Sequence, residues 1–422
     1  MDPVNSFHSS LASTMQRRTR QKNNFEEIES SLPSLESSPE PSLSRFCRPN
    51  GFLGRLARFL PGGRAVKKSN IVWLLDNTAF QHATHGHWCA EFIAAVFERE
   101  DKARLVDVVS GVAHAIGLAD DAKERKTVEE RVLPFLWDIR PATTITALHQ
   151  GRTRLRIGPS NANGLCSNVL TIPGSAEGSL VRTSAKSSKA GGDGAIPHME
   201  TYYAGPEGWG IISDIDDTIK VTLTSDPVGI LRESFVNSPR PIPGMPELYA
   251  EMRSLLPEDT AWFYLSASPY NLYPFLKKFR KDHYPSGTLI LRDSSWKTMA
   301  GLLSALTLDT EEYKVDRMTK INSWLPKKKM IVVGDSTQSD PEAYGEIYRT
   351  FPGWIKLILI RKATDVAAVG IEEKNEPERF EAAFEDIPRE AWHVFEEPSE
   401  CVEIIKSAIS RGEPNSKDLA AT

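Results

Sequence analysis

Cysteine is scarce in this sequence, whose 422 residues include only Cys47, Cys89, Cys166 and Cys401. No two of them form a CxxC pair, which argues against a disulfide framework or a zinc site and fits a reducing compartment. The sequence also lacks a run of about 18 uncharged apolar residues, and its N-terminus lacks the apolar core of a secretory signal. We therefore expect a cytoplasmic protein whose contact with a membrane is peripheral.

Acidic residues are absent from residues 45–68, a stretch that contains seven basic side chains: Arg45, Arg48, Arg55, Arg58, Arg64, Lys67 and Lys68. Its bulky apolar residues share one helical face, and they are Phe52, Leu53, Leu56, Phe59 and Leu60. The pattern predicts a short basic amphipathic helix, which either contacts a membrane surface or docks on the next domain. Because the stretch is short and carries no RNA- or DNA-binding motif, we expect no nucleic-acid partner.

The remaining composition is that of a soluble globular protein, with 40% hydrophobic and 25% charged residues and a net charge of −5. The length allows two or three domains. Residues 1–44 are rich in Ser, Pro, Glu and Gln and lack hydrophobic periodicity, so we expect residues 1–69 to be a disordered tail that includes the basic segment. The Ser/Pro-rich part is either simply solvated or serves as a phosphorylated or partner-binding stretch.

Residues 70–172 are expected to form a smaller, mixed α+β domain. Trp88–Val106 and Val128–Trp137 have helical periodicity, whereas Thr143–Ile157 alternates and is β-branched, which predicts a strand or hairpin. Three neighbouring histidines lack a paired cysteine or an acidic ligand set, which favours a surface loop over a metal site: His82, His85 and His87. The sequence assigns no chemistry to this domain.

Residues 174–196 are rich in Gly, Ser and Ala and are predicted to be a flexible linker or a long loop, so we place a linker at 173–204. A second domain at 205–410 and a flexible tail at 411–422 are expected to follow. In the second domain, short apolar runs alternate with helical segments, which predicts βαβ units and a mostly parallel sheet. The apolar runs are Gly210–Ser213, Trp262–Leu265, Thr288–Leu291, Met330–Val333 and Ile355–Ile360. The helical segments are Pro246–Leu255, Tyr273–Arg280, Lys314–Trp324 and Pro341–Arg349.

Polar residues follow three of these predicted strands, and in parallel sheets ligands bind at the carboxyl ends of the strands. The first strand is followed by Asp214-Ile215-Asp216-Asp217-Thr218. Asp214 can act as a nucleophile that forms an aspartyl-phosphate, and Asp216 can protonate the leaving alkoxide and later activate water. Repulsion between two close carboxylates raises the pKa of one of them, which suits an acid beside an anion. The alternative for this turn is a helix N-cap.

An attacking carboxylate and a phosphate dianion repel each other, so the chemistry needs a cation. Mg²⁺ prefers oxygen ligands, and Asp214 and Asp335 could supply its carboxylates. Gly334 precedes Asp335 and permits a tight approach. Asp340 either helps the metal shell or caps the helix that begins at Pro341.

Two further residues are predicted to bind the phosphoryl group. Ser266 follows the second strand, where its hydroxyl and nearby backbone N–H groups can hold a phosphoryl oxygen. Lys314 opens the helix before the fourth strand and can neutralise both the nucleophile and the phosphoryl oxygens. Lys320, further into the same helix, is the alternative.

Taken in order, these four elements resemble the haloacid dehalogenase superfamily of aspartyl-phosphate phosphotransferases. The Asp214–Thr218 turn matches the DxDxT motif, and Ser266, Lys314 and the run from Gly334 to Asp340 match the later motifs. The resemblance implies a Rossmann-like parallel sheet with a small cap, a phosphate monoester substrate and Thr218 among the phosphate-binding residues. It also implies Mg²⁺ held by Asp214, Asp335 and the backbone carbonyl of Asp216. An acidic residue at position 216 implies a phosphatase rather than a transport ATPase.

More narrowly, this domain resembles the fungal actin-patch phosphatidate phosphatase family in five segments: SDIDDTIKVT, LSASPYNLYPFL, GTLILRD, EYKVDRM and GDSTQSDPEAYGEIY. The earlier phrases VWLLDNTAF, EERVLPFLWDI and LRIGPSNANG are similar to that family's N-terminal region. The resemblance implies hydrolysis of phosphatidate to diacylglycerol and phosphate at a membrane surface. It also implies location at membranes or cortical actin patches and possible cytoskeletal or endocytic partners; the oligomeric state stays open.

The short intervals between the motifs leave little room for a large cap, so we expect an open active site. Residues 227–245 are apolar in places and form either a flap near the membrane or part of the packing against the sheet. Two other functions stay open: a phosphatase of a soluble phosphomonoester or phosphoprotein, and a cortical actin or endocytic adaptor in which catalysis is secondary.

Overall fold

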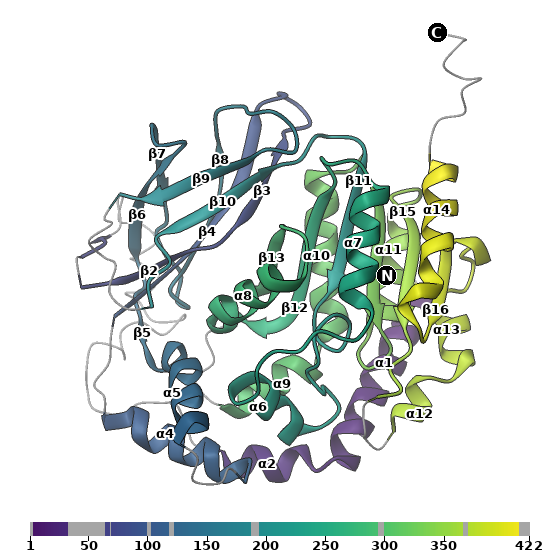
Figure 1. Cartoon of the computed structure of the whole chain (residues 1–422), viewed down its shortest axis with the longest axis horizontal. Helices are drawn as coiled ribbons and strands as arrows, with labels where there is room; N and C mark the ends of the chain where they lie inside the picture. The colour runs from purple at the N-terminus through teal and green to yellow at the C-terminus, as the bar shows by residue number, and fades with distance from the viewer. Residues whose placement is uncertain are drawn as a thin grey trace.

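The computed structural model describes residues 3–32, 64–67, 69–98, 103–117, 122–186, 194–293, 299–365 and 370–412. It contains two sheets, one built from the N-terminal part of the chain and one from the C-terminal part (Figure 1). Helices α1 and α2, far away in sequence, lie along the lower edge of the second sheet in this view. None of the helices in this described part of the chain has both the length and the apolar character needed to cross a bilayer.

The C-terminal sheet has six strands in the order β13-β12-β11-β14-β15-β16, and every neighbouring pair is parallel. Its strands are β11 (Trp209–Asp214), β12 (Ala261–Pro269), β13 (Thr288–Arg292), β14 (Lys329–Asp335), β15 (Ile355–Arg361) and β16 (Trp392–Phe395). The central strands are apolar at successive positions because helices cover both faces of the sheet. The predicted parallel α/β sheet is confirmed, and β16 is an addition that the sequence reading missed.

The helices around this sheet include all four that periodicity predicts. They are α6 (Pro227–Phe235), α7 (Met245–Leu255), α8 (Tyr273–His283), α9 (Met299–Thr307), α10 (Thr310–Trp324), α11 (Asp340–Thr350), α12 (Ile371–Lys374), α13 (Pro377–Ala383) and α14 (Cys401–Gly412). The apolar residues of 227–245 pack inward, since Ile230, Leu231 and Phe235 have no exposed surface. Packing, rather than a membrane flap, is therefore the better account of this segment.

The N-terminal sheet has ten strands. They are β1 (Arg64–Ala65), β2 (Ile71–Leu74), β3 (Asn77–Gln81), β4 (Trp88–Glu98), β5 (Asp138–Ile139), β6 (Thr143–His149), β7 (Thr153–Ile157), β8 (Leu165–Thr171), β9 (Leu180–Ala185) and β10 (His198–Tyr203). Two helices, α4 (Ala103–Ala115) and α5 (Ala122–Leu136), complete it. The predicted hairpin at 143–157 is confirmed as β6 and β7, and α5 covers the predicted helix at 128–137.

One predicted helix in this part is wrong, because Trp88–Glu98 is the strand β4. β4 pairs with β2, β3, β5 and β8. Most of its side chains are buried, whichever face they occupy, so the apolar residues do not alternate. A run of this kind cannot be distinguished from a buried helix by periodicity alone.

The predicted linker at 173–204 is also wrong, because it contains the strands β9 and β10. β9 and β10 pair with each other, and they join the N-terminal sheet through β6 and β3. This sheet runs on to Tyr203, six positions before β11 begins at Trp209.

Buried polar contacts fix the two sheets against each other. The backbone N–H of Asp76 donates to the Tyr273 hydroxyl at 2.8 Å, and the Asp76 carboxylate accepts from Lys277 at 2.8 Å. The hydroxyls of Thr78 and Thr288 are 2.7 Å apart. Because buried polar groups are costly without partners, these bonds tie the two sheets into one packed unit.

The predicted disordered tail contains two helices, α1 (Pro3–Lys22) and α2 (Phe25–Ser31). Phe25 has no exposed surface and belongs to the main hydrophobic core. Side chains of this segment also bond to the C-terminal domain, and a polar composition cannot reveal such tertiary support. The Ser/Pro-rich stretch and most of the basic segment 45–68 lie outside the described residues.

Candidate active site

The acidic turn begins where β11 ends. Asp214 is the last residue of this strand, and it lies fully buried between β12 and β14. The turn that follows is tight: Asp217 adopts a left-handed conformation with φ of 63°, and its backbone N–H donates to the carbonyl of Lys220 at 2.8 Å. This geometry lets Asp214 and Asp216 both reach the carboxyl end of the sheet.

Asp214 contacts two of the other predicted site residues. Its Oδ1 lies 2.8 Å from the Nζ of Lys314, and its Oδ2 accepts a hydrogen bond from Thr218 at 3.1 Å. Thr218 also donates to Asp335 at 2.8 Å. Three segments that are distant in the sequence therefore meet around one carboxylate, as the strand-end argument predicts.

Asp216 has a separate set of partners. Its Oδ2 accepts from the Ser266 hydroxyl at 2.5 Å, and its Oδ1 accepts from Thr222 at 2.8 Å. The ammonium of Lys220 donates to the same Thr222 hydroxyl at 2.9 Å. These bonds fix the Asp216 side chain, and Lys220 and Thr222 are positioning residues that the sequence analysis did not identify.

Asp335 and Asp340 form a carboxylate cluster with Asp214. Asp340 accepts from the backbone N–H of Asp335 at 2.9 Å, and its other oxygen accepts from Lys314. Asp335 accepts from the backbone N–H of Thr337 at 2.6 Å. Asp340 is the first residue of α11, one position after the N-cap Ser339, and its carboxylate lies in the acidic cluster.

Burial controls the electrostatics of this cluster. It raises the pKa of Asp214 well above its usual value, and the nearby Asp340, Asp335 and Asp216 act in the same direction, while Lys314 opposes them. Burial and Asp340 also raise the pKa of Asp335. For Lys314, burial acts to lower the pKa, but Asp214, Asp340 and Asp335 together raise it above the usual value. Lys314 therefore stays charged among carboxylates whose mutual repulsion is only partly offset.

The same cluster has the donor chemistry of a site for a hard divalent cation. Carboxylate oxygens of Asp214, Asp335 and Asp340 lie within 4.8 Å of one another. Asp214 Oδ1 is buried and lacks a well-aligned hydrogen bond, although Lys314 lies beside it. Three carboxylates against one ammonium leave residual negative charge, and all the donors are oxygens, so these residues fit Mg²⁺.

Two basic residues from the C-terminal helices brace the loop after β14. Lys374 donates to Ser225 at 3.3 Å and to the carbonyl of Thr337, and burial together with nearby Arg379 lowers the pKa of Lys374 to about 8. Arg379 donates to the carbonyl of Ser336 at 2.6 Å and pairs with Glu342 at 2.8 Å. No motif marks these residues in the sequence.

The structure also decides three remaining expectations. Lys320, the alternative to Lys314, pairs with Glu91 at 2.6 Å and is not at the carboxylate cluster. His82, His85 and His87 lie exposed in the turn between β3 and β4, and none belongs to a possible metal cluster within the described residues. The expected open active site is wrong, because the predicted catalytic side chains are at most 2% exposed.

Gly334 is a position where a larger residue should be damaging. A Cβ there would lie 2.5 Å from Asp340 Oδ2 and 2.6 Å from its Cβ. We expect Gly334→Ala to cost about 1–3 kcal/mol of stability, because Asp340 must shift in a packed core. Since Asp340 bonds to Asp335 and Lys314, any catalysis at this site should fall as well. Chemical unfolding and turnover would test this, and wild-type values for both would contradict it.

The similarity of this chain to known proteins lies in the region that contains these site residues. Residues 209–362 match the family model described as the catalytic domain of phosphatidate phosphatase APP1. The curated phosphatidate phosphatase APP1 of Saccharomyces cerevisiae is 35% identical over 173 residues, which are 40% of this chain and 28% of the yeast protein. An uncharacterised protein of Schizosaccharomyces pombe is 28% identical over 159 residues, 36% of this chain and 25% of that protein. The matches thus span about a quarter of each relative, and the region matched by the family model contains every predicted site residue.

Proposed function

We propose that this chain is a Mg²⁺-dependent phosphatidate phosphatase that works through an aspartyl-phosphate. The observation that carries the proposal is the placement of Asp214 and Asp216 in one turn, with Lys314 2.8 Å from the first and Ser266 2.5 Å from the second. The similarity of residues 209–362 to the catalytic domain of a phosphatidate phosphatase supports the substrate.

In the first half-reaction, a carboxylate oxygen of Asp214 attacks phosphorus and the bond from phosphorus to the glycerol oxygen breaks. Asp216 gives its proton to that oxygen, so that diacylglycerol leaves as a neutral alcohol. Lys314 holds charge beside the nucleophile, and Ser266 and Thr218 lie within reach of the phosphoryl oxygens. In the second half-reaction, Asp216 takes a proton from water, the oxygen of that water attacks phosphorus, and phosphate leaves as Asp214 is regenerated.

Asp214, Asp335 and the backbone carbonyl of Asp216 would hold Mg²⁺, with Asp340 in the surrounding shell. When bound, the ion supplies positive charge that offsets the repulsion between the nucleophile and the phosphate. The peripheral membrane location follows from the substrate. A link to actin patches and cytoskeletal or endocytic partners stays a prediction from the resemblance of the sequence, because the Ser/Pro-rich stretch lies outside the described residues.

The direct test is phosphate release from phosphatidate in mixed vesicles, measured with Mg²⁺ and with a chelator. We expect release with Mg²⁺ and its near-complete loss with the chelator, restored by added Mg²⁺ but not by Na⁺ at equal ionic strength. Folded protein that hydrolyses p-nitrophenyl phosphate but not phosphatidate would favour the soluble-substrate alternative. Release that is indifferent to the chelator would contradict the metal.

A further inference from the structure

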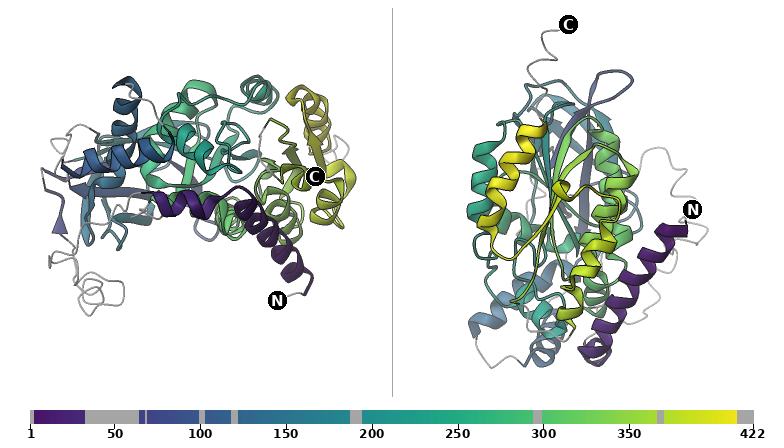
Figure 2. Two further views of the ribbon diagram at one scale, coloured as in Figure 1. Left: turned by 90° about the horizontal axis from the view of Figure 1, so that it is seen from below. Right: turned by 90° about the vertical axis from the view of Figure 1, so that its right-hand side faces the viewer.

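Residues 13–32 pack against the elements that carry the active-site residues. This segment, called here the N-terminal strap, comprises the second half of α1 and all of α2. Figure 2 shows it in purple, running across the C-terminal domain in the view from below. It contacts α6, α9 and α11, the helices at the edge of the sheet where β11 and β14 end.

Polar bonds tie the strap to residues next to the catalytic ones. Gln16 donates to Thr310 at 2.7 Å and to Ser339 at 3.3 Å. Ser339 immediately precedes Asp340, and Thr310 begins the helix that carries Lys314. Arg20 donates to Thr307 at 2.5 Å. The strap therefore bonds to the elements that position the carboxylate cluster.

Apolar packing and an ion pair within the strap also hold it against the C-terminal domain. Phe25 is fully buried, with the Arg20 guanidinium 4.7 Å above its ring. Arg20 also pairs with Glu29 at 2.6 Å, and Glu29 in turn accepts from Ser304 of α9 at 3.2 Å. Each end of the strap is thus anchored to the C-terminal domain.

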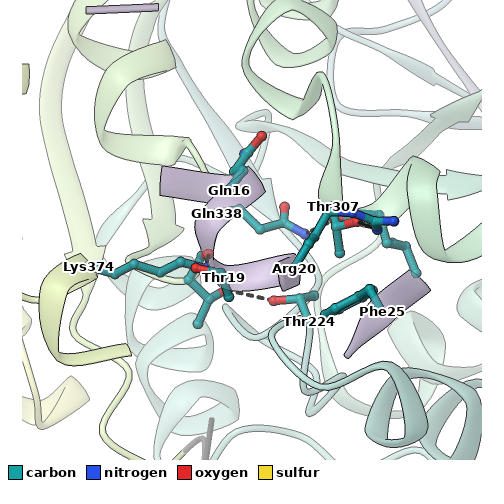
Figure 3. A pocket seen from close by; sticks show the side chains of 10 residues that line it. Gln16, Thr19, Arg20, Phe25, Thr224, Thr307, Gln338 and Lys374 are labelled. Atoms are coloured by element: carbon teal, nitrogen blue, oxygen red, sulfur yellow. Dashed lines mark hydrogen bonds between the residues drawn. The ribbon is translucent and has the colours of Figure 1, made fainter. Parts of the chain in front are cut away.

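The cavity beneath the strap is too small for a phosphate ester. This cavity has a volume of about 10 Å³, and its lining includes Gln16, Thr19 and Arg20 of the strap and Thr224, Thr337 and Lys374 of the C-terminal domain (Figure 3). Such a volume holds about one water molecule. Thr337 bonds to Asp335, so this cavity lies one residue away from the carboxylate cluster. A phosphate ester needs the strap to move.

The outer side of the strap is basic. This holds for the α1 part, where Arg17, Arg18 and Lys22 are exposed and no acidic residue lies between positions 3 and 25, whereas α2 carries the exposed Glu26 and Glu27. Lys22 pairs with Glu373 at 2.6 Å, but both side chains are exposed, and such pairs are weak. Each basic residue near an anionic leaflet strengthens binding by about fivefold. The inner side of α2 carries Phe25 and Ile28, apolar residues that suit a bilayer interface once the strap is lifted.

We propose that the N-terminal strap is an autoinhibitory lid, and that an anionic lipid surface opens it by binding Arg17, Arg18 and Lys22. The regulation rests on the proposed function, because it concerns access to the same site. It confines hydrolysis to membranes whose charge can displace the strap, which includes membranes rich in phosphatidate itself.

The first test weakens the strap and measures hydrolysis of p-nitrophenyl phosphate without lipid. We expect the double variant Gln16→Ala/Arg20→Ala to be about tenfold or more faster than wild type, since one hydrogen bond with a charged partner shifts a two-state equilibrium by that factor. Lys278→Ala, which removes an exposed lysine on α8, is the matched control and should match wild type. Equal rates for the double variant and wild type, with both folded, would overturn the lid.

The second test adds vesicles that contain no substrate. Phosphatidylserine vesicles should accelerate p-nitrophenyl phosphate hydrolysis by wild type, whereas neutral phosphatidylcholine vesicles should not. Arg17→Glu/Arg18→Glu should keep the lipid-free rate and lose the acceleration. Equal acceleration of this variant, or equal acceleration by neutral vesicles, would overturn the role of the basic surface.

A third test locks the strap shut. Lys22→Cys/Glu373→Cys places two exposed thiols at an ion pair, where a short bismaleimide can join them. We expect the linked protein to lose its response to phosphatidylserine, while each single-cysteine variant treated alike keeps it. A fully active linked protein would overturn the lid. If phosphatidate is not hydrolysed but phosphatidylserine still accelerates hydrolysis of p-nitrophenyl phosphate, the substrate assignment fails and the lid stands. If phosphatidate is hydrolysed but phosphatidylserine does not accelerate hydrolysis of p-nitrophenyl phosphate, only the lid is contradicted.

Discussion

Asp214→Asn should fold like wild type and lose at least about a thousandfold in turnover, because an amide cannot form the aspartyl-phosphate. The loss should be the same for phosphatidate and for p-nitrophenyl phosphate, since both need the nucleophile. Stability should hold or rise, because burial and the neighbouring carboxylates already raise the pKa of Asp214 and disfavour its charge. Turnover and chemical unfolding, measured in parallel, would test both statements.

Two comparison variants sharpen this result. Asp282→Asn changes an exposed aspartate on α8 and should leave turnover unaltered. Asp216→Asn should lose far more activity on phosphatidate than on p-nitrophenyl phosphate, because nitrophenolate leaves without a proton donor whereas an alkoxide does not. Equal losses on the two substrates would remove Asp216 from the role of general acid, and turnover by Asp214→Asn near the wild-type rate would defeat the whole mechanism.

The parts of the site that the sequence could predict are those with a short-range signature. Asp214, Ser266 and Asp335 follow apolar runs, and parallel strands bring such positions to one edge. Lys314 and Lys320 could not be separated by spacing, whereas in the structure one contacts Asp214 and the other pairs with Glu91. The choice depended on how α10 packs, which a local pattern does not contain.

The supporting residues had no such signature. Lys374 and Arg379 lie far along the chain from the motifs they brace, and they act through bonds to backbone carbonyls of the loop after β14. Lys220 stands close to the acidic turn, but only the hydrogen bond through Thr222 links it to Asp216. Residues of this kind are defined by tertiary contacts and not by a pattern.

The errors in the fold have the same origin. β4 is buried on both faces, so the alternation that marks a strand is missing over Trp88–Glu98. β9 lies within a Gly- and Ser-rich stretch, and its pairing with β6 and β10 overrides that composition. Helices α1 and α2 are polar overall, yet the burial of Phe25 and the bonds from Gln16 and Arg20 anchor them. The open active site was expected because the intervals between the motifs leave little room for a large cap, and the segment that packs over the site comes from the other end of the chain.

Lys314→Met should damage both stability and activity, because it removes the ammonium that contacts Asp214 and Asp340. Breaking a buried ion pair from one side costs about 3–5 kcal/mol. Without Lys314, the pKa values of the remaining carboxyls should rise further, and a carboxyl whose pKa is higher in the folded state loses stability as pH rises. The variant should therefore be least stable at high pH and recover toward mildly acidic pH.

The matched control for this prediction is Lys320→Met, one and a half turns along the same helix, which should keep its activity because Lys320 pairs with Glu91 away from the site. Chemical unfolding at mildly acidic and at alkaline pH, with and without Mg²⁺, would measure the effect. Since a bound cation substitutes for part of the missing charge, Mg²⁺ should stabilise Lys314→Met more than wild type. A variant with wild-type stability at all pH values would show that the carboxylates of Asp214, Asp335 and Asp340 do not depend on this lysine.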